Sequence, residues 1–305
     1  MHEDSVSYED EFSLRDYIFS IWESRNLILY SALFFFSLFG LYSFLLKDVY
    51  TSSSVLYIVE DQDAGGMGSL LNQYSGLASS AGVSLPTSST SKTDIFLATI
   101  ESKEFFTHLL SFEGVKENLF AAKKYDMENK KVIYDTNYFN PEDGTWITEE
   151  PDPLDSYYQF KEDGVMSVYY DDFDNMISIS VTHISPDFAY YFCNLIIQEV
   201  NNLIRVRHLN ESNSALEYLN KQYTLSPQKN IRESINQLVE AQMKIQMLAN
   251  VRKDYMIRPL DKPFRPNEKS GPFRIKIIAL GFLLGLFFGI FGVLLKLYLF
   301  PKDVK

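Results

Sequence analysis

The residue types that most often carry out chemistry in proteins are sparse along this chain. Its four histidines are isolated from one another in sequence: His2, His108, His183 and His208. Their spacing matches neither a zinc site nor a catalytic H-E-x-x-H helix, so each is interpreted as an ordinary surface or helix histidine. The single cysteine, Cys193, excludes an intrachain disulfide and a cysteine metal cluster. We therefore expect no metal site and no cofactor.

Carboxylates are abundant, and one local group of them falls in a predicted turn. Residues 171–175 read DDFDN, which invites a calcium interpretation. An EF-hand loop needs an oxygen ligand at its fifth position and glycine at its sixth, but counting from Asp172 places Met176 and Ile177 there. The sequence therefore favours a solvated turn. The G-x-x-x-x-G-K-[ST] and G-x-S-x-G motifs are also missing from the chain, so no catalytic residues are predicted.

Composition narrows the classes of function further. The chain has 305 residues, with 28 Lys+Arg and 40 Asp+Glu, so its formal net charge is 28 − 40 = −12. A nucleic-acid partner is not expected, because such binding needs a basic face that displaces counterions from phosphates. Only 14 Gly and 11 Pro occur, which excludes collagen-like and low-complexity classes.

Two long apolar runs dominate the organisation of the chain. Residues 27–46 contain no formal charge, and residues 277–296 contain only the lysine at their end. At about 1.5 Å per residue, each run spans the roughly 30 Å hydrocarbon core of a bilayer. The acidic N-terminal segment and the missing cleavage site argue against a signal peptide. We expect two transmembrane helices with both termini on one side, although the count of basic residues leaves the orientation open.

The second apolar run carries glycines at a regular spacing. Gly281, Gly285 and Gly289 are four residues apart, which places them along one stripe of a helix. Glycine is frequent in membrane helices, but this spacing favours close approach of another helix. We predict that these glycines pack against the first span of the same or a neighbouring chain, or against a partner.

The remaining segments flank or separate the two runs. Residues 1–26 and 297–305 are short tails, and residues 12–22 have the spacing of a short amphipathic helix. We expect neither tail to hold a catalytic or DNA-binding domain. Residues 47–276 must therefore carry the main function.

The first part of this central segment alternates between β and helical patterns. A β-rich stretch at 51–60 precedes a Gly/Ser-rich loop at 65–91, and residues 94–110 have helical spacing. Residues 115–162 are polar, aromatic and irregular, whereas residues 165–182 alternate like a β-hairpin. The segment therefore predicts a small mixed sheet with helices.

A long helix follows the hairpin. Ser185-Pro186 is a helix-start signal, and the helical pattern then continues over residues 187–224 without a breaker. These 38 residues would extend about 57 Å, more than one small domain can cover. A second helix is predicted at 229–251. We expect the long helix to protrude from its sheet and to pack on other copies of the chain.

A proline-rich link, residues 257–272, connects the second helix to the second span. Proline lacks an amide donor, so this link can form an edge strand but not a central one. The prolines of the link are Pro259, Pro263, Pro266 and Pro272.

The order of these parts resembles one known family. The sequence KTDIFLATIESKEFFTHLL at 92–110, after a span, a β start and a Gly/Ser-rich loop, is similar to the opening of bacterial polysaccharide chain-length determinants, also called polysaccharide co-polymerases. The sequence MLANVRKDYMIRPLDKPFRP at 247–266, followed by a Gly-rich span, is similar to their closing part. The resemblance covers nearly the whole chain, with no quoted motif over 115–164.

This resemblance implies an α+β fold: two transmembrane helices flanking a periplasmic mixed-sheet base domain with a long protruding helix. It implies an inner-membrane protein with cytoplasmic termini that forms a homo-oligomeric ring. Its function would be to set the modal length of a surface polysaccharide, together with the membrane polymerase. The sequence shows no tyrosine kinase domain, which is closer to the lipopolysaccharide O antigen type. A lipid-linked glycan is a further candidate partner.

Two other classes of function stay open at this stage. A two-span periplasmic sensor would need an output domain or a partner that supplies one. A membrane-anchored glycan-processing enzyme would need two carboxylates that meet only in the fold, which the sequence leaves open. The regulator without enzymatic activity is the favoured interpretation.

Overall fold

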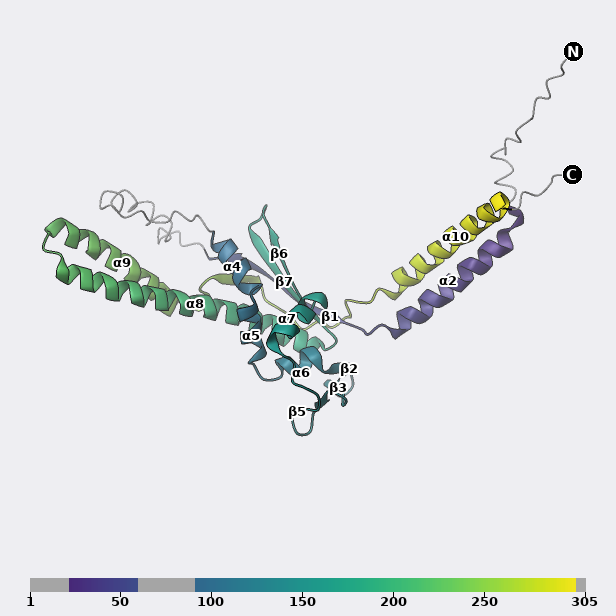
Figure 1. Ribbon diagram of the computed structural model, residues 1–305, viewed down its shortest axis with the longest axis horizontal. Helices are drawn as coiled ribbons and strands as arrows, with labels where there is room; N and C mark the ends of the chain where they lie inside the picture. Colours follow the sequence, from purple (N-terminus) through teal and green to yellow (C-terminus); the bar gives the residue numbers. More distant parts are fainter. Residues whose placement is uncertain (1–21, 60–90, 300–305) are drawn as a thin grey trace, which may run out of the picture. The chain divides into compact units, whose positions relative to one another are not determined.

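The computed structural model describes residues 22–59 and 91–299 (Figure 1). The amphipathic helix expected at 12–22 and the Gly/Ser-rich loop expected at 65–91 lie outside the described residues, apart from the last residue of each. Residue 60 of the expected β stretch, residues 1–21 of the N-terminal tail and residues 300–305 of the C-terminal tail also lie outside them, whereas the remaining expected elements fall within them.

The chain divides into two compact units. The central unit is Val49–Glu268, and the terminal unit combines the segments on either side of it. In the terminal unit, α2 (Arg25–Leu45) and α10 (Arg274–Leu299) pack along each other in opposite directions. By length and composition, both helices could cross a membrane. They coincide with the apolar runs at 27–46 and 277–296.

The central unit is built on a four-stranded sheet with the strand order β6-β7-β1-β8. The α+β class is confirmed, but the sheet is antiparallel throughout rather than mixed. The strands β7 and β8 are joined through helices and run in the same direction, but β1 lies between them, so they do not pair. The strands are β1 (Tyr50–Ile58), β6 (Met166–Asp171), β7 (Met176–His183) and β8 (Ile257–Asp261).

The longest element, α8 (Pro186–Leu225), starts in the core of this unit. The Ser185 side chain caps its first turn by accepting a hydrogen bond from the Phe188 amide at 3.2 Å. The helix start predicted at Ser185-Pro186 is therefore confirmed. The first half of α8 buries its apolar face in a cluster with the sheet, which includes Leu56, Ile177, Ile179, Val181, Phe192, Ile196 and Val200.

The second half of α8 pairs with α9 (Lys229–Val251) to form a helical hairpin (Figure 1). Two polar contacts hold the pair. The Ser212 hydroxyl donates to the Gln242 carbonyl at 3.1 Å, and the Gln246 amide donates to the Asn213 side chain at 2.6 Å. With 40 residues, α8 is about 60 Å long, so the expected long helix is confirmed.

The expected helix at 94–110 is two helices, α4 (Lys92–Ile100) and α5 (Lys103–Leu110). Ser102 ends the continuity, because its hydroxyl accepts a hydrogen bond from the Phe105 amide at 3.1 Å and starts a new helix there. The helical periodicity of the side chains continues across this break, so periodicity alone does not reveal it.

The stretch 115–162 is more ordered than its polar composition indicates. It contains two short helices and two small hairpins, in which the β2 and β3 strands pair with each other and the β4 and β5 strands do the same. Asp152 caps the second helix by accepting from the Leu154 amide at 2.9 Å. The elements are α6 (Val115–Phe120), β2 (Ala122–Asp126), β3 (Lys131–Tyr134), β4 (Phe139–Asn140), β5 (Thr145–Trp146) and α7 (Pro153–Glu162).

Asn201 joins α8 to β8, and replacing it should destabilise the central unit. Its buried side chain accepts from the amides of Met256 (2.8 Å) and Ile257 (3.0 Å) and donates to the Ile257 carbonyl (2.9 Å). In Asn201→Leu these backbone groups lose their partner, so the free energy of unfolding should fall by about 2–4 kcal/mol. Denaturant unfolding of the full-length protein in detergent, followed by circular dichroism, measures the change. The exposed Asn210→Leu on the same helix is the control, and an equal loss in both variants would contradict the assignment.

Candidate functional site

The proline-rich link is the first candidate site that the sequence indicates. Pro259 lies in β8, at the edge of the sheet, and pairs in register with Leu56. An edge strand tolerates proline because one side of the strand needs no amide donor. Pro263 and Pro266 are buried in the structure, whereas Pro272 is half-buried and follows a cis peptide bond.

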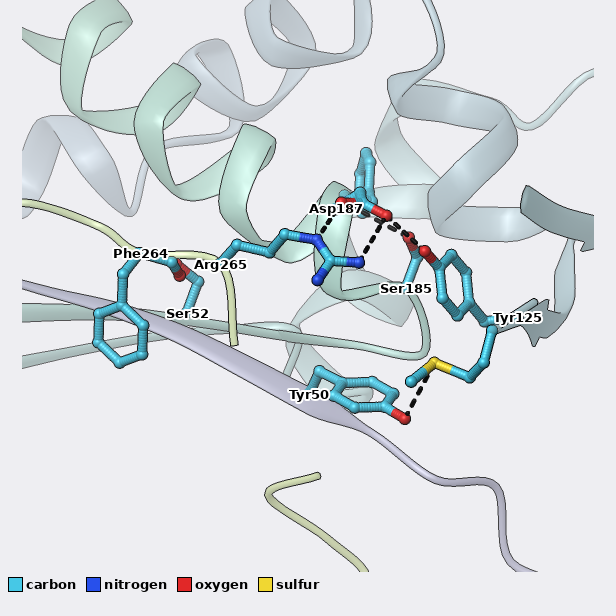
Figure 2. Close-up of polar contacts among 9 residues, drawn as sticks. Tyr50, Ser52, Tyr125, Ser185, Asp187, Phe264 and Arg265 are labelled. Carbon is cyan, nitrogen blue, oxygen red and sulfur yellow. Dashed lines mark hydrogen bonds and ion pairs between the residues drawn. The ribbon is translucent and has the colours of Figure 1, made fainter. Parts of the chain in front are cut away.

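Two buried serines of β1 hold the link against the sheet. The Ser54 hydroxyl donates to the Asp261 carbonyl at 2.6 Å, and the Ser52 hydroxyl donates to the Phe264 carbonyl at 2.8 Å. Figure 2 shows Ser52 beneath the link at Phe264. Hydroxyl donors of the neighbouring strand therefore satisfy these two carbonyls of the link.

A second contact fixes the link to the start of α8. The Arg265 guanidinium donates to both carboxylate oxygens of Asp187, with Nη2 at 3.3 Å from Oδ2. The Tyr125 hydroxyl of β2 donates to the same carboxylate (Figure 2). We call Tyr125, Asp187 and Arg265 the clamp. It joins three segments that are distant in sequence.

The electrostatics of the clamp favour a charged carboxylate. The hydrogen bond from Arg265, supported by the one from Tyr125, lowers the pKa of Asp187 below its ordinary value of 3.8. Asp187 also lies in the first turn of α8, where the positive end of the helix dipole stabilises an anion. Burial, together with the neighbouring carboxylate, raises the pKa of Tyr125, which keeps its hydroxyl protonated as a donor.

Replacing Asp187 should weaken the clamp in a pH-dependent way. The pair is between a third and a half exposed, so Asp187→Asn should lower the free energy of unfolding by about 1 kcal/mol or less at neutral pH. Because the folded-state pKa of Asp187 is lowered, this contribution is complete above pH 3.8 and is lost as the pH falls through the folded pKa. Denaturant unfolding of parent and variant from pH 7 to pH 3 measures it. Asp172→Asn, in the β6–β7 turn, is the control; a difference independent of pH would contradict the assignment.

The glycine stripe lies along α2 within the terminal unit. A Cβ atom built on Gly281 would lie 2.5 Å from Phe39 Cβ, and one on Gly289 would lie 2.9 Å from Ile28 Cα. At Gly285 the nearest atom would be the Ala32 Cα, at 2.6 Å. These distances are shorter than real Cβ contacts, so only glycine permits this approach of the two helices.

Gly285→Leu should therefore separate α2 from α10 without blocking insertion. Phe35 and Phe288 stack at 5.4 Å between ring centroids, so cysteines at these two positions report the distance between the helices. In a Cys193→Ser background, disulfide yield between Phe35→Cys and Phe288→Cys should fall several-fold when Gly285→Leu is added.

The control is Gly292→Leu, because an added Cβ there meets no atom of the described residues within 4 Å. Equal cross-linking yields with Gly285→Leu and with Gly292→Leu would show that the close approach at Gly285 does not hold the helices together.

The described histidines each have a separate partner. His108 Nε2 lies 2.7 Å from Glu199 Oε2, His183 Nε2 lies 2.9 Å from the Asn118 carbonyl, and His208 Nδ1 lies 2.9 Å from the Tyr255 hydroxyl. Contrary to the surface or helix interpretation, His183 is buried at the end of a strand. Within the described residues, the structure shows no group of three metal-ligating side chains.

Two further features of the sequence have simple structural settings. Cys193 is buried in the core, where burial raises the pKa of its thiol to about 12. In the acidic turn, the Asp171 carboxylate accepts from the Phe173 amide at 2.9 Å, and the Tyr170 hydroxyl donates to Asn175 at 2.8 Å. The carboxylate of Asp171 is therefore engaged within its own turn.

The clamp is not predicted from the sequence. The helix start before Asp187 and the prolines around Arg265 are local signals, but no local pattern indicates that Tyr125 reaches the same place. Arg265 and Asp187 are 78 positions apart, and a lone Arg or Asp in a charged chain carries no information about its partner.

The order of the elements and one family match indicate the class of protein. Two apolar helices of membrane-spanning length precede and follow an α+β unit with a long helical hairpin. Residues 10–109 match the family model described as Wzz, chain length determinant protein. This match confirms the resemblance to the chain length determinant family over the first third of the chain.

Solved structures with the same general description align with the chain at low identity. A "full-length bacterial polysaccharide co-polymerase" aligns over 96% of this chain and 100% of its own, with 12% identity and a TM-score of 0.38. A fragment of WzzB, a polysaccharide co-polymerase from Salmonella Typhimurium, covers 74% of this chain and 100% of its own, with 11% identity and a TM-score of 0.29. No curated protein matches the chain.

Proposed function

We propose that this chain is an inner-membrane regulator of the modal chain length of a surface polysaccharide, with lipopolysaccharide O antigen as the polymer. It acts on the membrane polymerase and has no catalytic activity of its own. The observation that carries the proposal is the match of residues 10–109 to the chain length determinant family. The two helices of membrane-spanning length support it, because such a regulator must stay where the polymer is made.

In the proposed topology, α2 and α10 cross the membrane once each. The tails at 1–26 and 297–305 lie in the cytoplasm, and residues 47–276 form the periplasmic domain. The opposite directions of the two helices support this topology, since the chain then leaves and re-enters the membrane on the same side.

Charged side chains in the terminal unit support the position of the periplasmic boundary. Arg274 Nη2 lies 2.9 Å from the Asp48 carboxylate, and Lys269 Nζ lies 3.5 Å from it. These groups follow α2 and precede or begin α10, where the apolar runs end. Ion pairs of this kind are stable in the headgroup region and costly in hydrocarbon.

A homo-oligomeric ring is part of the proposal. The helical hairpin extends beyond the core of its own unit, and several of its large apolar side chains are exposed. Neighbouring copies would cover them, because association removes exposed apolar side chains from water. These side chains include Tyr218, Leu225, Met243 and Val251.

The proline-rich link has a mechanical part in this function. Its prolines restrict the backbone dihedrals, and the serines and the clamp hold it against the central unit. We propose that this stiff segment carries changes in the periplasmic assembly to α10 and so to the polymerase.

Deletion of the gene in its source organism tests the proposal. The surface polysaccharide, separated by gel electrophoresis, should change from a clustered to a random length distribution while the amount of polymer stays similar. Expression of the parent chain from a plasmid should restore the clustering. Loss of all polymer on deletion would instead indicate a biosynthetic enzyme, and an unchanged distribution would contradict the proposed function.

A further inference from the structure

A pocket lies between the β2–β3 hairpin and the first turns of α8. Its volume is about 520 Å³, which is within the range of about 300–1,000 Å³ that is typical of small-molecule sites. Asp187 and Tyr125 of the clamp form one side of it. We call it the hairpin pocket. The other side chains that line it have no part in the contacts that hold the link.

Aromatic side chains make up much of the wall. Phe188 is buried and lies beside Tyr191, with ring centroids 6.4 Å apart, while Tyr134 faces the pocket from β3. The Tyr191 side chain is 44% exposed, so its ring is accessible to a ligand that enters the pocket. Faces of this kind pack against the C–H face of a sugar ring and leave the sugar hydroxyls free for polar contacts.

The charged side chains around the pocket carry both signs. Lys130 and Lys131 lie at the hairpin and Glu113 lies among the helices, while the charge of Asp187 is already balanced by Arg265. Two lysines beside one carboxylate give a small excess of positive charge, whereas a polyphosphate or a nucleic acid needs a cluster of cations. Lysine donors next to a carboxylate acceptor suit a ligand that offers both, as a hydroxyl-rich sugar does.

Asn118 adds a polar group that lacks a partner. Its amide nitrogen donates to the Gly114 carbonyl at 2.7 Å, which fixes the orientation of the side chain. Its amide oxygen is covered and meets no donor within the described residues. An unpaired oxygen of this kind is unfavourable, so a ligand hydroxyl that donates to it would be stabilising.

We propose that the hairpin pocket binds one sugar residue of the polysaccharide whose length the chain controls. The ring packs on Tyr191, and hydroxyls contact Lys130, Lys131 and Glu113, with Asn118 as a further acceptor. The inference rests on the proposed function for the source of the sugar, while the chemistry of the pocket itself selects a neutral, hydroxyl-rich ligand. Each copy of the chain would then hold the growing polymer at its central unit.

The test uses the full-length protein in detergent and oligosaccharides of one to five repeating units, released from the source organism's own surface polysaccharide. Calorimetry should detect binding to the parent. Tyr191→Ala should weaken it about tenfold, and Lys131→Glu, at an exposed position, should also weaken it. The matched control is Tyr190→Ala, because Tyr190 is 41% exposed on the same helix but does not line the pocket.

Three results would overturn the inference: no binding by the parent, equal weakening by Tyr190→Ala and Tyr191→Ala, or binding of inorganic pyrophosphate in place of the oligosaccharides. These results are separate from the deletion experiment. A deletion that changes polymer length, together with a parent that binds no oligosaccharide, would remove the pocket and keep the proposed function. Binding by the parent, together with an unchanged length distribution, would keep the pocket and remove the function.

Discussion

The structure depends on one helix that belongs to two environments. The first half of α8 supplies much of the central core, where Phe192, Ile196 and Val200 are fully buried against the sheet. Beyond Ile204, only Ser212 of this helix is buried. A helix can leave its core in this way only if something else covers it, because isolated helices in water are marginal. The pairing with α9 supplies part of that cover, and assembly with further copies is the proposed source of the rest.

The start of the same helix is also where distant segments meet. Asp187 takes hydrogen bonds from the link through Arg265 and from the β2–β3 hairpin through Tyr125, and it lines the hairpin pocket. A ligand in the pocket would therefore contact the carboxylate that holds the link. If a sugar residue binds there, its occupancy and the contact that holds the link are coupled through one side chain.

Much of the architecture follows from local sequence signals. The start of α8 follows from Ser185 and Pro186, and the two apolar runs follow from composition alone, because both signals act within a few residues. The break at Ser102 and the small hairpins between α6 and α7 did not follow. They depend on a cap within a continuing apolar period and on pairings that composition does not reveal. The clamp and the pocket depend on contacts across 60 to 80 positions, such as Tyr125 with Asp187, and no local pattern encodes them.

The central claim is that the chain regulates polymer length and does not make polymer. Graded expression of the gene in a deletion strain, with the polymerase level held constant, tests this claim most directly. Both the length distribution and the total sugar of the surface polysaccharide are measured at each level. The account predicts that the distribution moves from random to clustered as expression rises, while total sugar stays constant. Total sugar that rises in proportion to expression, with no change in the distribution of lengths, would contradict it.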